Sequence, residues 1–141
     1  MGEPGALFVA AFGLLVLAGL SHFIKNSVAN GTLDRNSEIG LRTKATTSSD
    51  AAWTAGHKAA GGWLSTCSYT GYLMGTATFA GALAAIATNS VHPLVWLLPA
   101  TGFVGAVVLL VLATAIASKA GKNATRFSHG DGSGSLDRNI E

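Results

Sequence analysis

Residues 4–24, PGALFVAAFGLLVLAGLSHFI, contain no Asp, Glu, Lys or Arg. A helix rises about 1.5 Å per residue, so roughly 20 residues cross a hydrocarbon core about 30 Å thick. The stretch therefore predicts a transmembrane helix over about residues 5–24. We expect this segment to be retained rather than removed as a signal peptide, because residues 1–4 before it carry no Lys or Arg and the apolar run is too long for a signal sequence.

Two later stretches, residues 59–88 and 93–118, also lack all four charged residue types. They predict transmembrane helices over about residues 61–88 and 93–118. The polar residues between them, TNSVH at 88–92, are followed by Pro93, which suits the first turn of a new helix. The sequence thus predicts an all-α fold, an integral membrane bundle of three transmembrane helices with a tight hairpin between the second and the third.

The composition agrees with a membrane protein and excludes several other classes. Hydrophobic residues make up 49% of the 141, and charged residues only 11%, too few to cover a soluble globular surface. The net charge of +2 is too small to favour nucleic acid as a partner. Cys67 is the only cysteine, and no two histidines stand at metal-ligand spacing. We therefore expect no metal and no cofactor.

The positive charges predict an orientation. All Lys and Arg lie in the first loop or after the third predicted span: Lys25, Arg35, Arg42, Lys44, Lys58, Lys119, Lys122, Arg126 and Arg138. With three helices these two regions lie on one side of the membrane, and the positive-inside rule makes that side cytoplasmic. We expect a single transmembrane domain over residues 1–127, with the N-terminus outside. Residues 128–141, rich in Gly, Ser and charge, are predicted to form a flexible cytoplasmic tail.

The first loop, residues 25–60, is too long to be a plain connector. Ser48 or Ser49 can cap a short helix, with Asp50 favourable in its first turn. Helical phase places Asp50, Trp53 and His57 within a narrow arc. We expect either one helix continuous with the second span or two helices with a bend near residues 61–62.

The same arc continues into the second span as a seam that consists mostly of small residues. It contains Leu64, Ser68, Gly71 and Gly75. Gly71 and Gly75 form a GxxxG pattern, which lets two helix backbones approach closely. We predict that these two glycines face another helix.

The loop carries an ordered series of polar positions. NSEIGLRT at residues 36–43 is followed by Thr46, Ser48, Trp53 and the pair His57-Lys58. This series resembles the signature of the SdpI-type immunity-protein family, and the spacing agrees without gaps from Asn36 to Lys58. The chain departs from that pattern at Lys44-Ala45, where the family often has Pro-Trp, and at Lys58, where Arg is commoner.

The resemblance implies a short, three-helix bacterial member of the family in the inner (plasma) membrane. The founding member protects a bacterium from its own secreted toxic peptide and holds a small repressor at the membrane. For this chain the resemblance implies binding rather than catalysis, through residues of the motif. Those residues are Asn36, Gly40, Arg42, Thr43, Asp50, Trp53 and His57.

Each candidate also has a simpler interpretation. Arg42 either binds a carboxylate or phosphate bidentately or anchors at lipid headgroups. Trp53 either covers the cytoplasmic end of the bundle or belongs to the interfacial aromatic belt. For His57 we favour a packed hydrogen-bonding role. We predict that Arg42, Trp53 and His57 form one cluster, with Asp50 as a charge partner nearby.

The sequence argues against an enzyme and against an ion-coupled transporter. Ser48 and Ser49 lie near His57, but nothing orients that histidine as a base, and capping explains the serines. None of the three predicted spans holds an ionisable group between its ends, as a coupled transporter would require.

We therefore expect an SdpI-like membrane binding protein, an immunity or sensing protein toward a toxic peptide. It would contact the lipid bilayer and a protein partner in the membrane or at its cytoplasmic face. The alternative is a small accessory subunit of a larger respiratory or transport complex, since three helices with small-residue seams leave surface for partner helices.

Overall fold

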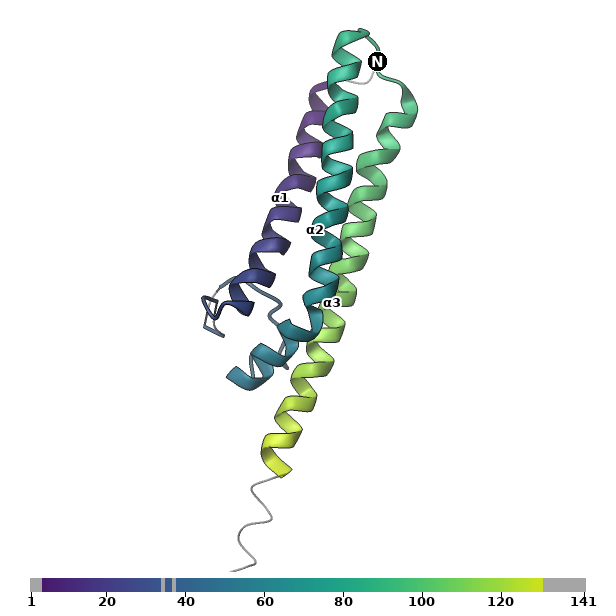
Figure 1. The fold of residues 1–141 in the computed structure, drawn as a ribbon. Helices are drawn as coiled ribbons and strands as arrows, with labels where there is room; N and C mark the ends of the chain where they lie inside the picture. The colour runs from purple at the N-terminus through teal and green to yellow at the C-terminus, as the bar shows by residue number, and fades with distance from the viewer. Residues whose placement is uncertain (1–3, 34, 37, 131–141) are drawn as a thin grey trace, which may run out of the picture. The chain divides into compact units, whose positions relative to one another are not determined.

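The computed structural model describes residues 4–33, 35–36 and 38–130 and is all-α in these residues. Three long helices follow one another in the chain, α1 (Pro4–Ala29), α2 (Asp50–Ala87) and α3 (Leu97–Gly130) (Figure 1). A short 3-10 helix, η1 (Pro93–Trp96), leads into α3. Each long helix contains a stretch apolar and long enough to cross a membrane, so the protein is a multi-pass membrane protein with three candidate spans.

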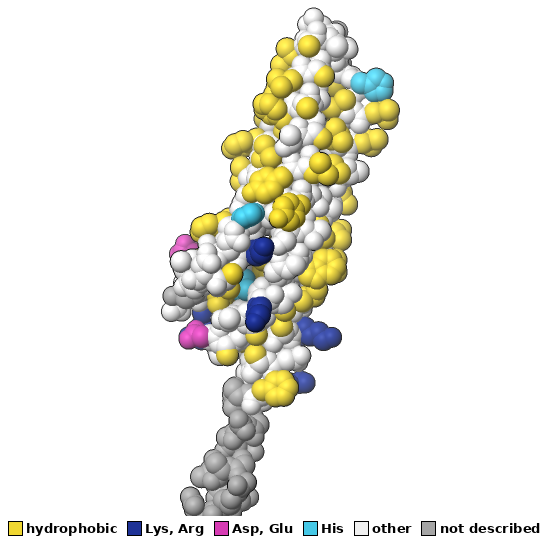
Figure 2. Space-filling view, viewed as in Figure 1, with side chains coloured by type: hydrophobic (Ala, Val, Ile, Leu, Met, Phe, Trp, Pro, Cys, Tyr) yellow, Lys and Arg dark blue, Asp and Glu magenta, His cyan; other side chains and the backbone are white. Residues whose placement is uncertain are grey.

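The chain divides into two compact units. The apolar unit comprises Met1–Phe23 and Gly62–Val111, and the loop unit comprises Ile24–Gly61 and Leu112–Glu141. The described residues of the apolar unit include no Asp, Glu, Lys or Arg, whereas every described Lys and Arg lies in the loop unit. Figure 2 shows dark blue Lys and Arg side chains only on the loop unit. The division of the fold thus follows the division of charge.

All three helices are longer than the apolar stretches that predicted them. α1 ends at Ala29 rather than near residue 24, α2 begins at Asp50 rather than near residue 61, and α3 continues to Gly130 rather than ending near residue 118. Hydropathy marks only the residues that suit lipid, and charged side chains do not interrupt helical hydrogen bonding. α2 has 38 residues, whereas about 20 helical residues suffice to cross a hydrocarbon core about 30 Å thick.

The expected short helix in the first loop is not a separate element. Between α1 and α2 the described residues form turns and bends, and residues 50–60 are the first turns of α2 itself. Of the two arrangements left open by the sequence, the helix continuous with the second span is the one found. The predicted flexible tail begins at residue 128. Residues 128–130 belong to α3, and residues 131–141 lie outside the described part of the chain.

Within the apolar unit, α2 packs on α1 through the predicted small-residue seam. A Cβ added to Gly71 would lie 2.8 Å from the Cβ of Ala18 and 3.1 Å from the carbonyl oxygen of Leu14. One added to Gly75 would lie 3.2 Å from the carbonyl oxygen of Ala11. These distances are shorter than ordinary carbon contacts, so the two backbones approach more closely than any side chain on α2 would allow.

The third helix of the apolar unit packs by the same means. A Cβ on Gly102 of α3 would lie 2.9 Å from the Cβ of Met74 and 3.0 Å from a methyl group of Leu14. Large side chains point outward instead, including Val9, Phe12, Leu73 and Val104, each more than 60% exposed. A soluble protein would bury such side chains, whereas lipid covers them at no cost.

The hairpin between α2 and α3 is as short as the sequence predicts. Residues 88–92 connect the helices, and Asn89 adopts a positive φ of 50°, which asparagine tolerates better than most residues. The ring of His92 accepts a hydrogen bond from the backbone N–H of Leu94 through Nδ1 at 3.3 Å. Pro93 occupies the first turn, as expected.

Candidate functional site: a latched loop

The candidate site lies in the loop unit, where the first loop folds onto the beginning of α2. Ser49 caps this helix, because its hydroxyl accepts a hydrogen bond from the backbone N–H of Ala52 at 3.1 Å. Ser48, the other capping candidate, uses its hydroxyl differently. That hydroxyl lies 2.7 Å from the carbonyl of Ala45 and 3.0 Å from the Thr125 hydroxyl on α3. The loop is thereby held on both sides, by α2 and by α3.

His57 joins the loop to α2. Its Nε2 accepts a hydrogen bond at 2.9 Å from the backbone N–H of Leu41. Its Nδ1 lies 3.0 Å from the carbonyl oxygen of Trp53. Nε2 must be unprotonated to accept from Leu41, so the proton is on Nδ1 and the imidazole is neutral. His57 is only 3% exposed, and both of its ring nitrogens are hydrogen-bonded.

Trp53 packs against His57 and reaches a second point of the loop. The two ring centroids are 4.1 Å apart, with the planes inclined by 42°. The indole Nε1 donates a hydrogen bond to the carbonyl oxygen of Leu33 at 3.2 Å. Trp53 is 3% exposed. One turn of α2 therefore holds the loop at two backbone groups, and we call this arrangement the latch (Leu33, Leu41, Trp53 and His57).

Gly40 is required by the latch for two independent reasons. Its φ is +132°, a conformation that side chains rarely permit. An added Cβ would lie 2.7 Å from Cη2 of Trp53 and 3.1 Å from Nε2 of His57. The glycine of the motif thus lets the loop backbone cross directly over the two rings.

A pair of threonines closes the turn that follows Leu41. The backbone N–H of Thr43 donates to Oγ1 of Thr46 at 2.9 Å, and the backbone N–H of Thr46 donates to Oγ1 of Thr43 at 3.2 Å. The Thr46 hydroxyl lies 2.7 Å from the carbonyl oxygen of Leu41, and its side chain is completely buried. This reciprocal bonding fixes the loop without regular secondary structure.

Two glycines outside the predicted set bring the loop, α2 and α3 together. A Cβ on Gly56 would lie 2.7 Å from the Thr46 methyl group and 2.9 Å from the carbonyl oxygen of Ala117. A Cβ on Gly121 would lie 3.1 Å from the carbonyl carbon and oxygen of Ala45. Sequence reasoning missed both glycines, because neither belongs to a GxxxG pair and each packs in part on the loop, whose path helical periodicity does not predict.

The charged residues of the motif lie at the surface. Asp50 pairs with Arg35, whose Nε is 3.1 Å from a carboxylate oxygen, and the Asp50 side chain is 87% exposed. Arg35 was not among the predicted site residues. Arg42 is exposed, and one of its terminal nitrogens lies 3.5 Å from the carbonyl oxygen of Arg35. Asn36 is exposed as well.

The structure thus places the predicted site residues in two groups. Gly40, Thr43, Trp53 and His57 lie in or beside the latch. Asn36, Arg42 and Asp50 lie outside it on the exposed surface. Trp53 and His57 are brought together as the helical arc predicted. Asp50 forms an ion pair with Arg35. Arg42 comes directly after Leu41, whose backbone N–H donates a hydrogen bond to His57.

Comparison with known proteins agrees with this picture. Residues 32–117, which include the latch, all of α2 and the first part of α3, match the SdpI/YfhL protein family. No curated protein and no solved structure matches the chain. The matched region covers more than half of the chain and begins at the loop that α2 holds. The protein is therefore a membrane protein that belongs to the SdpI/YfhL family.

Proposed function

We propose that this protein is a binding protein of the bacterial plasma membrane that serves immunity or sensing toward a toxic peptide. Its first loop and tail face the cytoplasm, and its N-terminus lies outside. Family membership supports the first part of the proposal, and the confinement of positive charge to one unit supports the orientation. The observation that carries a binding role is the latch, because a plain connector between two spans needs no fixed conformation.

The latch suggests that the residues of the motif have two different roles. Gly40, Trp53 and His57 give the loop one conformation, which lowers the entropy lost when a partner binds it. Arg42 and Asn36 then present polar groups on the fixed surface. An arginine whose backbone position is fixed can bind a carboxylate or phosphate well, because its planar guanidinium can make two parallel hydrogen bonds.

Deletion of the gene in its own bacterium tests the immunity role. The deletion strain and its parent would be grown in medium conditioned by a dense culture of the parent. We expect growth of the deletion strain to be inhibited and a plasmid copy of the wild-type chain to restore it. Equal growth of both strains in conditioned and fresh medium would overturn the immunity proposal.

Cysteine labelling tests the orientation separately. In a Cys67→Ala background, Ser90→Cys in the α2–α3 hairpin should react with a membrane-impermeant maleimide added to intact cells. Lys44→Cys in the first loop should react only after the cells are opened. Both positions are exposed in the structure. The opposite labelling pattern would reverse the orientation.

A second candidate is an accessory subunit of a larger membrane complex. It is favoured by the large side chains that the helices leave exposed, such as Phe12 and Leu73, each 68% exposed, since partner helices can cover these as well as lipid can. Purification in a gentle detergent distinguishes the candidates. A complex with larger subunits at fixed stoichiometry would support the accessory role, whereas a small particle of this chain alone would support the binding protein.

A further inference from the structure

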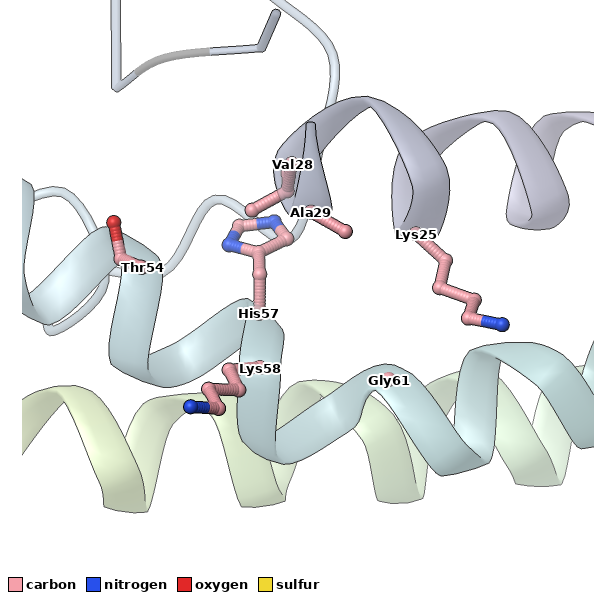
Figure 3. Close-up of a pocket in the computed structure, with 7 residues that line it drawn as sticks. All are labelled: Lys25, Val28, Ala29, Thr54, His57, Lys58 and Gly61. Atoms are coloured by element: carbon pink, nitrogen blue, oxygen red, sulfur yellow. The ribbon is translucent and has the colours of Figure 1, made fainter. Parts of the chain in front are cut away.

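A pocket of about 420 Å³ lies in the loop unit, where the end of α1 meets the beginning of α2. Lys25, Val28 and Ala29 line it from α1, and Figure 3 shows Lys25 and Val28 reaching toward α2. Its volume lies within the range of small-ligand sites, about 300–1,000 Å³. Neither the latch nor the exposed surface of Arg42 accounts for this pocket.

The α2 side of the pocket is formed by about two turns of helix. Thr54, His57, Lys58 and Gly61 line it. The His57 ring points from α2 toward Val28 and Ala29 (Figure 3). Both ring nitrogens of His57 are engaged in the latch, so only carbon edges of the ring are free to contact a ligand. The lining is mostly apolar, with two ammonium groups at its edges.

The two lysines have a particular position in the sequence. Lys25 is the first charged residue after the uncharged stretch of residues 4–24, and Lys58 is the last before the uncharged stretch of residues 59–88. Each therefore stands where an apolar helix segment meets the polar region of the bilayer. Among the residues that the structure describes, neither lysine has a carboxylate within ion-pair distance.

From this arrangement we infer that the pocket binds an anionic phospholipid. The lipid phosphate would lie at the ammonium group of Lys25, with Lys58 adding positive charge from α2, and the glycerol and first acyl carbons would pack on Val28 and Ala29. A zwitterionic lipid would bring a choline or ethanolamine cation near two like charges, so the site should select against it. A soluble anion would lack the apolar contacts and bind more weakly.

Isolated lysines at a membrane surface also attract anionic lipid, each by roughly fivefold in affinity, without any pocket. The shape of the site distinguishes the two cases. Removing both charges should weaken binding by roughly 25-fold in either case, because two fivefold contributions multiply. Filling the pocket with charges intact should weaken binding only if lipid occupies the pocket.

The experiment is a titration of the purified full-length protein with phosphatidylglycerol or phosphatidylcholine, followed by native mass spectrometry. We expect wild type to bind phosphatidylglycerol preferentially and Lys25→Gln/Lys58→Gln to lose the preference. Lys25→Arg/Lys58→Arg should keep it. Val28→Phe should reduce it, because the larger side chain enters the pocket. The charge-matched control is Lys44→Gln/Lys122→Gln, whose lysines line a separate, more open hollow beside Arg126.

Three results would overturn the proposal. Equal losses in Lys25→Gln/Lys58→Gln and in the control would indicate diffuse attraction to a basic surface. Full binding by Val28→Phe, with an unchanged helical circular dichroism spectrum, would show that the pocket is not occupied. Displacement of phosphatidylglycerol by millimolar inorganic phosphate would show that a free anion, rather than a lipid, is recognised.

Discussion

His57 accepts a hydrogen bond at 2.9 Å from the backbone N–H of Leu41, a residue 16 positions earlier in the chain. The bond links the motif loop to a long helix that continues into the apolar unit. A histidine used in this way is neither a metal ligand nor a general base, since both of its nitrogens are engaged. Its value lies in fixing one conformation of a segment that has no regular secondary structure.

Replacing this histidine should release the loop. His57→Ala leaves the buried N–H of Leu41 without its partner, which costs about 1–3 kcal/mol. It also removes the surface on which Trp53 stacks. We expect faster chymotrypsin cleavage within the loop and a lower free energy of unfolding in detergent. Thr54→Ala, an exposed position one turn earlier, should change neither, and equal effects of the two substitutions would argue against the latch.

Acid should open the latch for the same reason. A protonated imidazole has no acceptor for the N–H of Leu41, so the folded loop excludes a proton that the released loop can bind. The stability of the loop should therefore fall as the pH is lowered from about 7.5 to about 5, the range in which histidines charge. In a Trp63→Phe/Trp96→Phe background, fluorescence reports on Trp53 alone. The same pH dependence in a His57→Asn variant would exclude His57 as its cause.

Gly40 should tolerate no side chain, whereas Gly31 should tolerate one better. Both have a positive φ, +132° and +70°, so alanine is strained at either position. Only at Gly40 does the added Cβ also meet Trp53, at 2.7 Å, while nothing lies within 4 Å at Gly31. We expect Gly40→Ala to destabilise the loop by at least about 1 kcal/mol more than Gly31→Ala, measured by urea unfolding in detergent. Similar losses would mean that the positive φ alone, and not the contact with Trp53, determines the cost of a side chain at Gly40.

The close packing at the seam of α2 can be tested by whether a Gly→Ala substitution stabilises or destabilises the protein. Alanine favours a helix over glycine by about 1 kcal/mol, so Gly105→Ala on α3, whose added Cβ would be no closer than 3.9 Å to its nearest neighbour, should be neutral or stabilising. Gly71→Ala should destabilise instead, because the new methyl meets Ala18 at 2.8 Å. Unfolding by sodium dodecyl sulfate would measure both. A stabilising Gly71→Ala would show that the helices separate easily.

Arg42 should not be replaceable by lysine if it binds a partner bidentately. Arg42→Lys keeps the charge and loses the planar fork, so retention of a partner, or protection by the chain, should fall at least about tenfold. Lys44→Arg, at another exposed position of the loop, is the matched control and should have no effect. Full function of Arg42→Lys would leave Arg42 as an anchor at lipid headgroups, where either cation serves.

Much of the fold could be predicted because the signals are local. Three uncharged stretches gave the three helices that can span a membrane, and a capping serine marked the beginning of α2 at Ser49. The helical arc placed Trp53 and His57 on one face, where the structure stacks them. Hydropathy did not indicate that α1 and α3 continue beyond their uncharged stretches, because it reports which residues suit lipid and not the backbone conformation.

The sequence by itself determined what depends on neighbours along the chain: helical periodicity, the order of the motif residues and the separation of charge from apolar segments. Only the tertiary structure decided which groups meet across the loop. The bond from Leu41 to His57, the pair Arg35–Asp50 and the close approach at Gly56 join residues many positions apart. Such contacts depend on how an irregular loop closes, and no periodicity records the path of a loop. The conformation of the loop depends on many small steric and hydrogen-bonding constraints at once. The clearest of them is the need for glycine at residue 40.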